Sequence, residues 1–289
     1  MNRLEGVWQR HDPQIAPIPL VFDSPHSGEI YPADFDHCLP RDVIRQAEDA
    51  HVGKLWAHVG SVGAALIEAE FPRSYIDPNR SLVDIDPALI ADAWHEPLIT
   101  TRKTSQGIGL VWRVVAGGIP LYARKLSSSE IRARIEHYYA PYHAELAKLL
   151  DARHHAFGAV WHVDCHSMPA VGDVNADDPG RERSDFVIGD RDGTTCEHEF
   201  TRFIAERVAA LGYSVAINDP YKGVEIVRQH GRPHEQRHSV QLEIKRSLYM
   251  NEATLEPHGG YAKLEADLRT LAGSLAGYVR SRLATGLAT

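Results

Sequence analysis

The sequence predicts an α/β fold in which helices flank a mixed, mostly parallel central sheet. The main observation is that apolar stretches typical of strands alternate along the chain with stretches of helical periodicity. The chain has no internal repeat, and no linker rich in Gly, Ser or Pro is long enough to divide its 289 residues into independent parts. We therefore expect a single domain over residues 1–289.

Short apolar runs bounded by turn residues predict the strands. The run at residues 19–23 leads directly into the turn SPHSG, and the run at residues 157–164 is apolar until its last, polar positions. The expected strands cover residues 19–23, 64–68, 73–76, 157–164, 185–189, 213–217 and 239–244.

Apolar residues at helical spacing predict the helices. The run SSSE at residues 127–130 is typical of a helix start, because hydroxyls cap free N–H groups and an acid suits the positive helix end. The expected helices cover residues 42–59, 127–152, 197–211 and 261–283. Residues 78–118 show no sustained period, which predicts long loops with a hairpin at residues 109–115.

Charge and composition exclude several classes of function. Lys and Arg total 31 against 39 Asp and Glu, and a net charge of -8 argues against nucleic-acid binding, which needs a basic surface. No run of 18 apolar residues exists, so we expect no transmembrane helix and no membrane partner. The sparse, odd set of Cys38, Cys165 and Cys196 suggests a reducing compartment, and we expect the cytoplasm.

Polar clusters stand at the ends of predicted strands, where ligands of open α/β sheets bind. In the first cluster a turn can direct His26 and Glu29 toward one point. In the second, His166 ends a distant apolar strand, and imidazole with carboxylate is a donor set that zinc accepts. On these residues alone, His26 belongs either to a metal site or to a solvated turn. Asp49 is then interpreted as an ordinary acid on a helix surface.

Alternation along the second strand groups the side chains around His166. Asp164 shares the direction of His166 and can orient its free ring nitrogen. Cys165 points the opposite way, so we expect it to pack in the core. His162 shares the direction of His166 but lies deeper, which predicts a hydrogen-bonded core histidine.

Glu243 stands between apolar neighbours on the last predicted strand, where an unpaired acid would be costly to bury. It either pairs with an arginine such as Arg246 or faces the site as a general base.

Three polar residues could bind a substrate carboxylate. An arginine fork suits that role, which makes Arg80 and Arg191 candidates, with Asn79 as a neutral donor beside Arg80. The alternative for each arginine is an exposed charge or a structural ion pair. The His- and Arg-rich residues 228–238 could form a loop over the site, and their role is left open.

Five motifs, taken together and in order, resemble the N-formylglutamate amidohydrolase (deformylase) family. The resemblance runs from about Val21 to Met250, and its motifs are SPHSG at residues 24–28, IDPNR at 76–80, DCHSM at 164–168, GDRDGT at 189–194 and QLE at 241–243. It implies a metal-dependent hydrolase that releases formate from N-formyl-L-glutamate in histidine degradation. It also implies the fold of the zinc carboxypeptidases, a mixed central sheet flanked by helices.

The resemblance further implies roles for the residues singled out above. His26 and His166 would hold one divalent metal ion, expected to be Zn2+, with Asp49 as third ligand and Glu29 as the alternative. Glu243 would be the base, and the pair formed by Asn79 and Arg80, with Arg191 as a further candidate, would bind the substrate carboxylate.

Two other interpretations of the same residues stay open. One is hydrolysis of another N-acyl amino acid or small amide by the same metal site. The other is a non-catalytic metal- or carboxylate-binding protein. The expected partner is a small N-acyl amino acid, and the sequence leaves the oligomeric state open.

Overall fold

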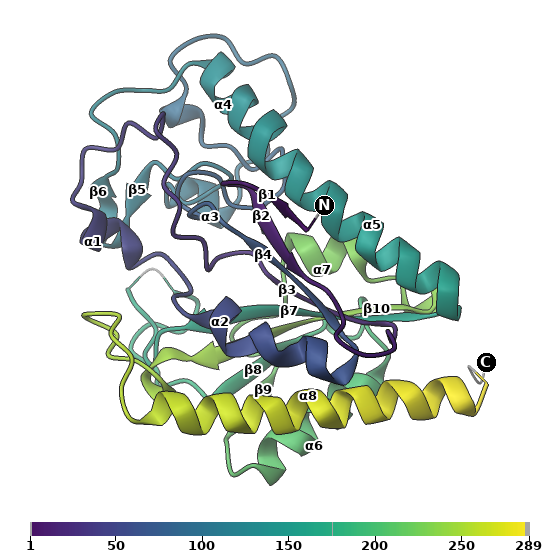
Figure 1. The fold of residues 1–289 in the computed structure, drawn as a ribbon. Helices are drawn as coiled ribbons and strands as arrows, with labels where there is room; N and C mark the ends of the chain where they lie inside the picture. Colours follow the sequence, from purple (N-terminus) through teal and green to yellow (C-terminus); the bar gives the residue numbers. More distant parts are fainter. Residues whose placement is uncertain (1, 175, 287–289) are drawn as a thin grey trace.

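The computed structural model describes residues 2–174 and 176–286, and an eight-stranded sheet runs through them (Figure 1). The strands stand in the order β1-β2-β4-β3-β7-β10-β8-β9. Their bounds are β1 (Arg3–Leu4), β2 (Trp8–His11), β3 (Leu20–Ser24), β4 (Ala65–Ala69), β7 (Val160–Met168), β8 (Phe186–Gly189), β9 (Val215–Ile217) and β10 (Arg237–Lys245).

The central strands are parallel and the edges are mixed. β4, β3, β7 and β10 pair in parallel, as do β8 and β9. β1, β2 and β4 are joined by antiparallel pairs, and β8 runs antiparallel to β10. This arrangement confirms the predicted mixed, mostly parallel sheet.

Helices cover both faces of the sheet (Figure 1). On one face α2, α6 and the long α8 bury a core that includes the alternate β3 residues Leu20 and Phe22. Val21, between them, points to the opposite face, where α5 supplies Tyr142 and Leu146 to a second core. The helices are α1 (Arg41–Arg45), α2 (Val52–Trp56), α3 (Arg102–Ser105), α4 (Ser128–Arg134), α5 (Ala140–Phe157), α6 (His198–Ala210), α7 (Glu225–His230) and α8 (Gly260–Ala284).

Most predicted elements are present. The expected long helix begins where its hydroxyls indicated, because Ser127 and Glu130 form a reciprocal capping box. It continues through a π-helical segment, Ile135–Tyr139, into α5. The edge strands β1 and β2 and the short helix α7 were not predicted. The expected hairpin lies further along the chain than predicted, between β5 (Val114–Val115) and β6 (Ile119–Pro120). Among the described helices, none has the length and apolarity needed to cross a bilayer.

The predicted helix over residues 42–59 is wrong. The chain forms α1, a turn, α2 and a 3-10 segment, Ala57–Val62. In the turn, the carbonyls of Gln46 and Glu48 accept hydrogen bonds from the Arg246 guanidinium, and the Asp49 N–H donates to the carbonyl of His26. These distant partners replace the bonds of a continuous helix, so local periodicity misled the prediction.

The predicted strand over residues 73–76 is also wrong. These residues form a turn in which the Tyr75 N–H donates to the Pro72 carbonyl at 3.0 Å. The Arg73 guanidinium folds back to form an ion pair with Asp77 at 3.0 Å.

The turn that carries His26 depends on a close approach at Gly28. A methyl group added at Gly28 would meet the Phe71 carbonyl oxygen at 2.2 Å. We expect Gly28→Ala to lower the free energy of unfolding by about 1–3 kcal/mol, because the backbone must shift. Urea unfolding followed by circular dichroism measures this change.

Gly277→Ala is the matched control, since nothing lies within 4 Å of that added methyl group in α8. We expect it to leave the stability unchanged or to raise it by up to about 1 kcal/mol, because alanine favours helix. Equal destabilisation by both substitutions would contradict the role of Gly28.

Candidate active site

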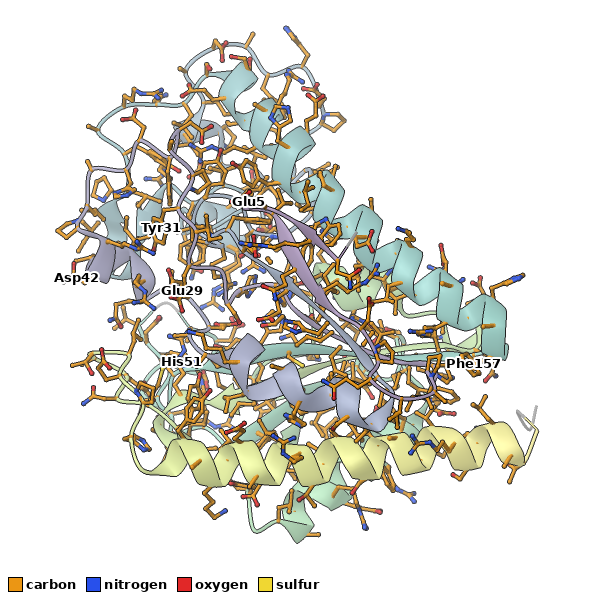
Figure 2. The ribbon with its side chains drawn as sticks, viewed as in Figure 1. Glu5, Glu29, Tyr31, Asp42, His51 and Phe157 are labelled. Carbon is orange, nitrogen blue, oxygen red and sulfur yellow. The ribbon has the colours of Figure 1, made fainter. Side chains whose placement is uncertain are left out.

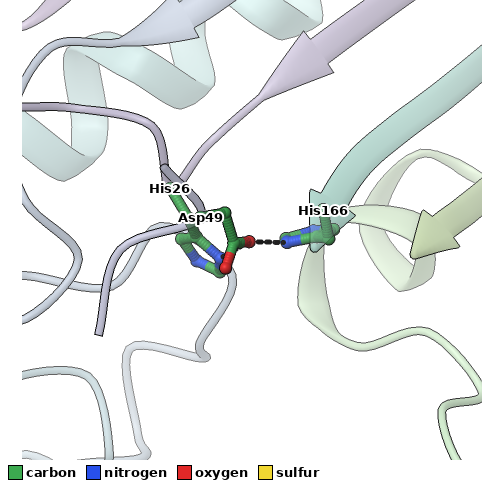
Figure 3. Close-up of side chains that lie close together, drawn as sticks. All are labelled: His26, Asp49 and His166. Carbon is green, nitrogen blue, oxygen red and sulfur yellow. Dashed lines mark hydrogen bonds and ion pairs between the residues drawn. The ribbon is translucent and has the colours of Figure 1, made fainter. Parts of the chain in front are cut away.

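His26, Asp49 and His166 converge on one buried point at the carboxyl edge of the sheet (Figure 3). His26 follows the end of β3, His166 lies near the end of β7, and Asp49 occupies the turn between α1 and α2. The Asp49 Oδ2 atom lies 3.3 Å from Nδ1 of His26 and 3.0 Å from Nδ1 of His166. One ligand atom from each residue lies within 4.8 Å of the others.

A second carboxylate orients each imidazole from behind. Nε2 of His26 lies 2.7 Å from Oδ1 of Asp77, and Nε2 of His166 lies 2.7 Å from Oδ1 of Asp164. Both Nδ1 atoms are therefore left to face Asp49. Metal-binding histidines usually show this outer contact, and two imidazoles with one carboxylate suit zinc. The donor set fits a divalent metal ion.

The pKa shifts of Asp49 and His26 favour the forms that bind a metal, whereas that of His166 favours the protonated form. Burial acts to raise the pKa of Asp49, but hydrogen bonds to His166 and His26 and the nearby charge of Arg73 bring it well below its usual value. The pKa of His26 is lowered by burial and then by Arg73. Burial also acts to lower the pKa of His166, but Asp164 and Asp49 raise it well above its usual value. Binding of a metal at this group would therefore release a proton.

Two arginines that were not predicted as site residues hold Asp49 in place. Nη2 of Arg246 lies 3.0 Å from Oδ1 of Asp49 and also donates to the Glu48 carbonyl at 2.7 Å. Nη1 of Arg73 lies 3.7 Å from the same Asp49 oxygen. The four-residue spacing of Arg73 and Asp77 is the one local signal in the sequence, and it could have indicated the ion pair between these two residues.

Glu29 lies outside the group. Its carboxylate lies 3.4 Å from Nζ of Lys54 and 3.5 Å from Nη2 of Arg45. Figure 2 shows it on the same flank of the molecule as Tyr31 and Asp42. The structure thus brings Asp49, and not Glu29, to the two histidines.

Glu243 lies beside His166, because the register of β10 on β7 pairs these two positions. With His26 and His166 it lines a cavity of about 650 Å3. The Gln241 amide donates to Oε1 of Glu243 at 2.8 Å. Burial raises the pKa of Glu243, the positive charge of His166 opposes this, and Asp49 adds to it.

The alternative partner predicted for Glu243 is engaged elsewhere. The Arg246 guanidinium forms its ion pair with Asp49, and no Lys or Arg of the described ranges 2–174 and 176–286 forms an ion pair with Glu243. Glu243 is therefore a buried acid that faces the cavity.

Asn79 and Arg80 both line the cavity. The Asn79 Nδ2 atom lies 3.1 Å from Nε2 of His166, and its Oδ1 accepts from the Ile226 N–H at 2.9 Å. Arg80 is only 7% exposed. Arg191 does not line the cavity; it donates to the Gly223 carbonyl at 3.2 Å and so contacts a loop that does.

The remaining sequence predictions concern neighbours of the site. His162 is a buried core histidine, bonded to Ser239 at 2.8 Å and to Asp23 at 2.9 Å, as predicted. Cys165 packs in the core on the opposite face, also as predicted. The arginines of residues 228–238 do not line the cavity; instead residues 220–224 do.

The fold and this site define a mixed α/β protein with a candidate metal centre and a buried acid beside one cavity. Residues 18–250 match the model of the N-formylglutamate amidohydrolase family. That span is most of the chain, so the protein belongs to the N-formylglutamate amidohydrolase family.

Individual relatives agree with this assignment. A protein named N-formylglutamate deformylase from Pseudomonas aeruginosa is 30% identical, over 92% of this chain and 96% of its own length. One of the same name from Pseudomonas putida is 32% identical, over 81% and 83%. The crystal structure of N-formylglutamate amidohydrolase from Ralstonia eutropha JMP134 is 45% identical, with a TM-score of 0.90 over 96% of this chain and 99% of that one.

The choice between the two candidate carboxylates can be tested directly. We expect Asp49→Asn to weaken zinc binding at least about 10-fold, because the site loses a charged ligand. Glu29→Gln is the matched control and should bind zinc like the parent protein. Competition with a chromophoric chelator measures both affinities. Loss of zinc affinity in Glu29→Gln alone would reverse the assignment.

Proposed function

We propose that this protein is a zinc-dependent deformylase that hydrolyses the formyl amide of N-formyl-L-glutamate to formate and L-glutamate. The observation that carries the proposal is the convergence of His26, Asp49 and His166 beside a cavity that Glu243 and Arg80 also line. Membership of the family, and the name that two relatives carry, support the choice of substrate. A place in histidine degradation would follow from that substrate.

His26, His166 and Asp49 would hold the zinc ion. When bound there, zinc supplies Lewis acidity that makes water a better nucleophile near neutral pH and polarises a carbonyl group. Asp77 and Asp164 fix the two imidazoles so that both Nδ1 atoms stay directed at the site.

Glu243 acts as the general base. Its carboxylate takes a proton from the attacking water as the new C–O bond forms at the formyl carbon. It then gives that proton to the amine nitrogen as the C–N bond breaks. Burial raises its pKa, which brings the acid closer to the pH at which it must both accept and return a proton, and Gln241 fixes the orientation of its carboxylate.

Arg80 binds a substrate carboxylate, because it is buried at the cavity and its fork suits that anion. Asn79 supports it from the neighbouring position, where its amide also contacts His166. We assign Arg191 a positioning role, since its side chain contacts the loop at Gly223. The expected cytoplasmic location stays a prediction from the three cysteines, which are unpaired in the structure.

Glu243→Gln tests the base. We expect kcat for formate release from N-formylglutamate to fall by about 10²–10⁴-fold, because the amide cannot accept a proton. Zinc content should stay at that of the parent protein. Glu206→Gln, on the exposed surface of α6, is the matched control and should keep full activity. A Glu243→Gln enzyme of unchanged kcat would contradict this role.

Removal of the metal tests the centre itself. We expect dialysis against a chelator to abolish formate release and one equivalent of zinc to restore it, since the proposed chemistry needs a Lewis acid. Full activity of the metal-free protein would refute the zinc-dependent mechanism. Turnover of other N-acyl amino acids in preference to N-formylglutamate would favour the broader hydrolase. Stoichiometric zinc with no turnover at all would favour a binding protein.

A further inference from the structure

Both acids and bases line the cavity, and two of its bases form no ion pair within the described residues. Five basic side chains line it: Arg73, Arg80, Lys103, Lys222 and Arg246. Three form ion pairs with carboxylates: Arg73 with Asp77, Arg246 with Asp49, and Lys222 with Asp192. Within residues 2–174 and 176–286, no carboxylate comes within ion-pair distance of the other two, Arg80 and Lys103.

Arg80 is held in place by neutral groups. Its Nη1 donates to the Asn79 carbonyl at 3.1 Å, and its Nε donates to the Ile108 carbonyl at 3.4 Å. Its Nη2 has no hydrogen-bond partner among the described residues. An arginine that is 7% exposed and forms no ion pair is costly to bury, although Asp77 and Asp84 lie near enough to compensate part of its charge, so an anion at this place would be favoured.

Lys103 lines the same cavity as Arg80. It lies on α3, whose first turn is capped by Thr101, and Thr101 Oγ1 donates to Asp84 at 2.6 Å. The Lys103 carbonyl accepts from the Ile108 N–H at 2.9 Å. Ile108 therefore contacts the backbone of Lys103 and the side chain of Arg80. The half-buried Lys103 side chain lines the same cavity as Arg80 and lies near enough to feel its charge.

We propose that Arg80 binds the α-carboxylate of the substrate and that Lys103 binds a second carboxylate on its side chain. Arg80 takes the anion nearer the reacting amide, because the adjacent Asn79 touches His166. Lys103 is then the specificity-determining residue that restricts the enzyme to N-acyl amino acids with an acidic side chain. This inference rests on the proposed function, since it names the residue that binds the side-chain carboxylate of the glutamate substrate.

The surroundings of Lys103 make this recognition dependent on pH. Burial, and then the positive charges of Arg80, Arg102 and Arg73, lower the pKa of Lys103 to about 8, and Asp173 opposes them. The ammonium is charged below that pH and loses its proton above it. A bound carboxylate would favour the charged form.

The test compares N-formylglutamate with N-formylglutamine, which has the same shape and a neutral side chain. We expect Lys103→Met to lower the ratio of kcat/KM for N-formylglutamate to kcat/KM for N-formylglutamine at least about 10-fold. The main cause should be a higher KM for N-formylglutamate. Lys103→Arg should keep most of the ratio. Lys222→Met is the matched control and should leave it unchanged, because that lysine already pairs with Asp192. An unchanged ratio in Lys103→Met, or an equal loss for both substrates, would overturn the inference.

The pH dependence gives a second readout. We expect the parent ratio to fall as pH rises through about 8, the pKa of Lys103, while Lys103→Arg keeps its ratio because a guanidinium stays charged. The ratio cancels the pH effects of the metal centre and of Glu243, which both substrates share. A parallel fall in both proteins would contradict the role of Lys103.

Binding separates failure of this inference from failure of the proposed function. If the zinc-loaded parent hydrolyses neither compound, the deformylase proposal fails, and calorimetry then compares their affinities. The inference would still be supported if the parent protein binds N-formylglutamate more tightly than N-formylglutamine and Lys103→Met loses this preference. Equal binding of both compounds by the parent protein would overturn it.

Discussion

The carboxylate of Asp49 is the contact on which the rest of the site depends. It is buried, and it joins the Nδ1 atoms of His26 and His166 to the guanidinium of Arg246. A buried charge persists only where other charges and hydrogen bonds compensate it. That requirement explains why the chain leaves helical geometry between α1 and α2: the turn must deliver Asp49 to partners from both ends of the sequence. Asp77 and Asp164 extend the same network behind the imidazoles.

The strands and their faces could be predicted because the signal is local. A period of two along β7 correctly put Asp164 and His166 on one face and Cys165 on the other. The segment at residues 42–59 could not be predicted, because its apolar spacing is helical while its decisive partner, Arg246, lies about 200 residues further along the chain. For the same reason Arg73 and Lys103 could not be identified from the sequence. The contact of Arg73 with Asp49 and the position of Lys103 at the cavity arise only in the folded chain.

The candidate site was predicted by two kinds of reasoning with different reach. Polar residues at strand ends gave His26, His166 and Glu243, since parallel strands bring their carboxyl ends to one edge. Spacing alone favoured Glu29 over Asp49, and only the family resemblance reversed that order. Neither kind of reasoning could predict which bases of the cavity form no ion pair, because that depends on the neighbours that the folded chain brings to each of them. Family membership therefore supports the proposed reaction, while the proposed charge of the substrate rests on Arg80 and Lys103.

The most direct measurement is diffraction from zinc-loaded crystals at energies on both sides of the zinc absorption edge. We expect one anomalous peak per chain at bonding distance, about 2 Å, from Nδ1 of His26, Nδ1 of His166 and the Asp49 carboxylate. A peak bound by Glu29 would contradict this expectation. So would a zinc ion that touches only one of the two imidazoles.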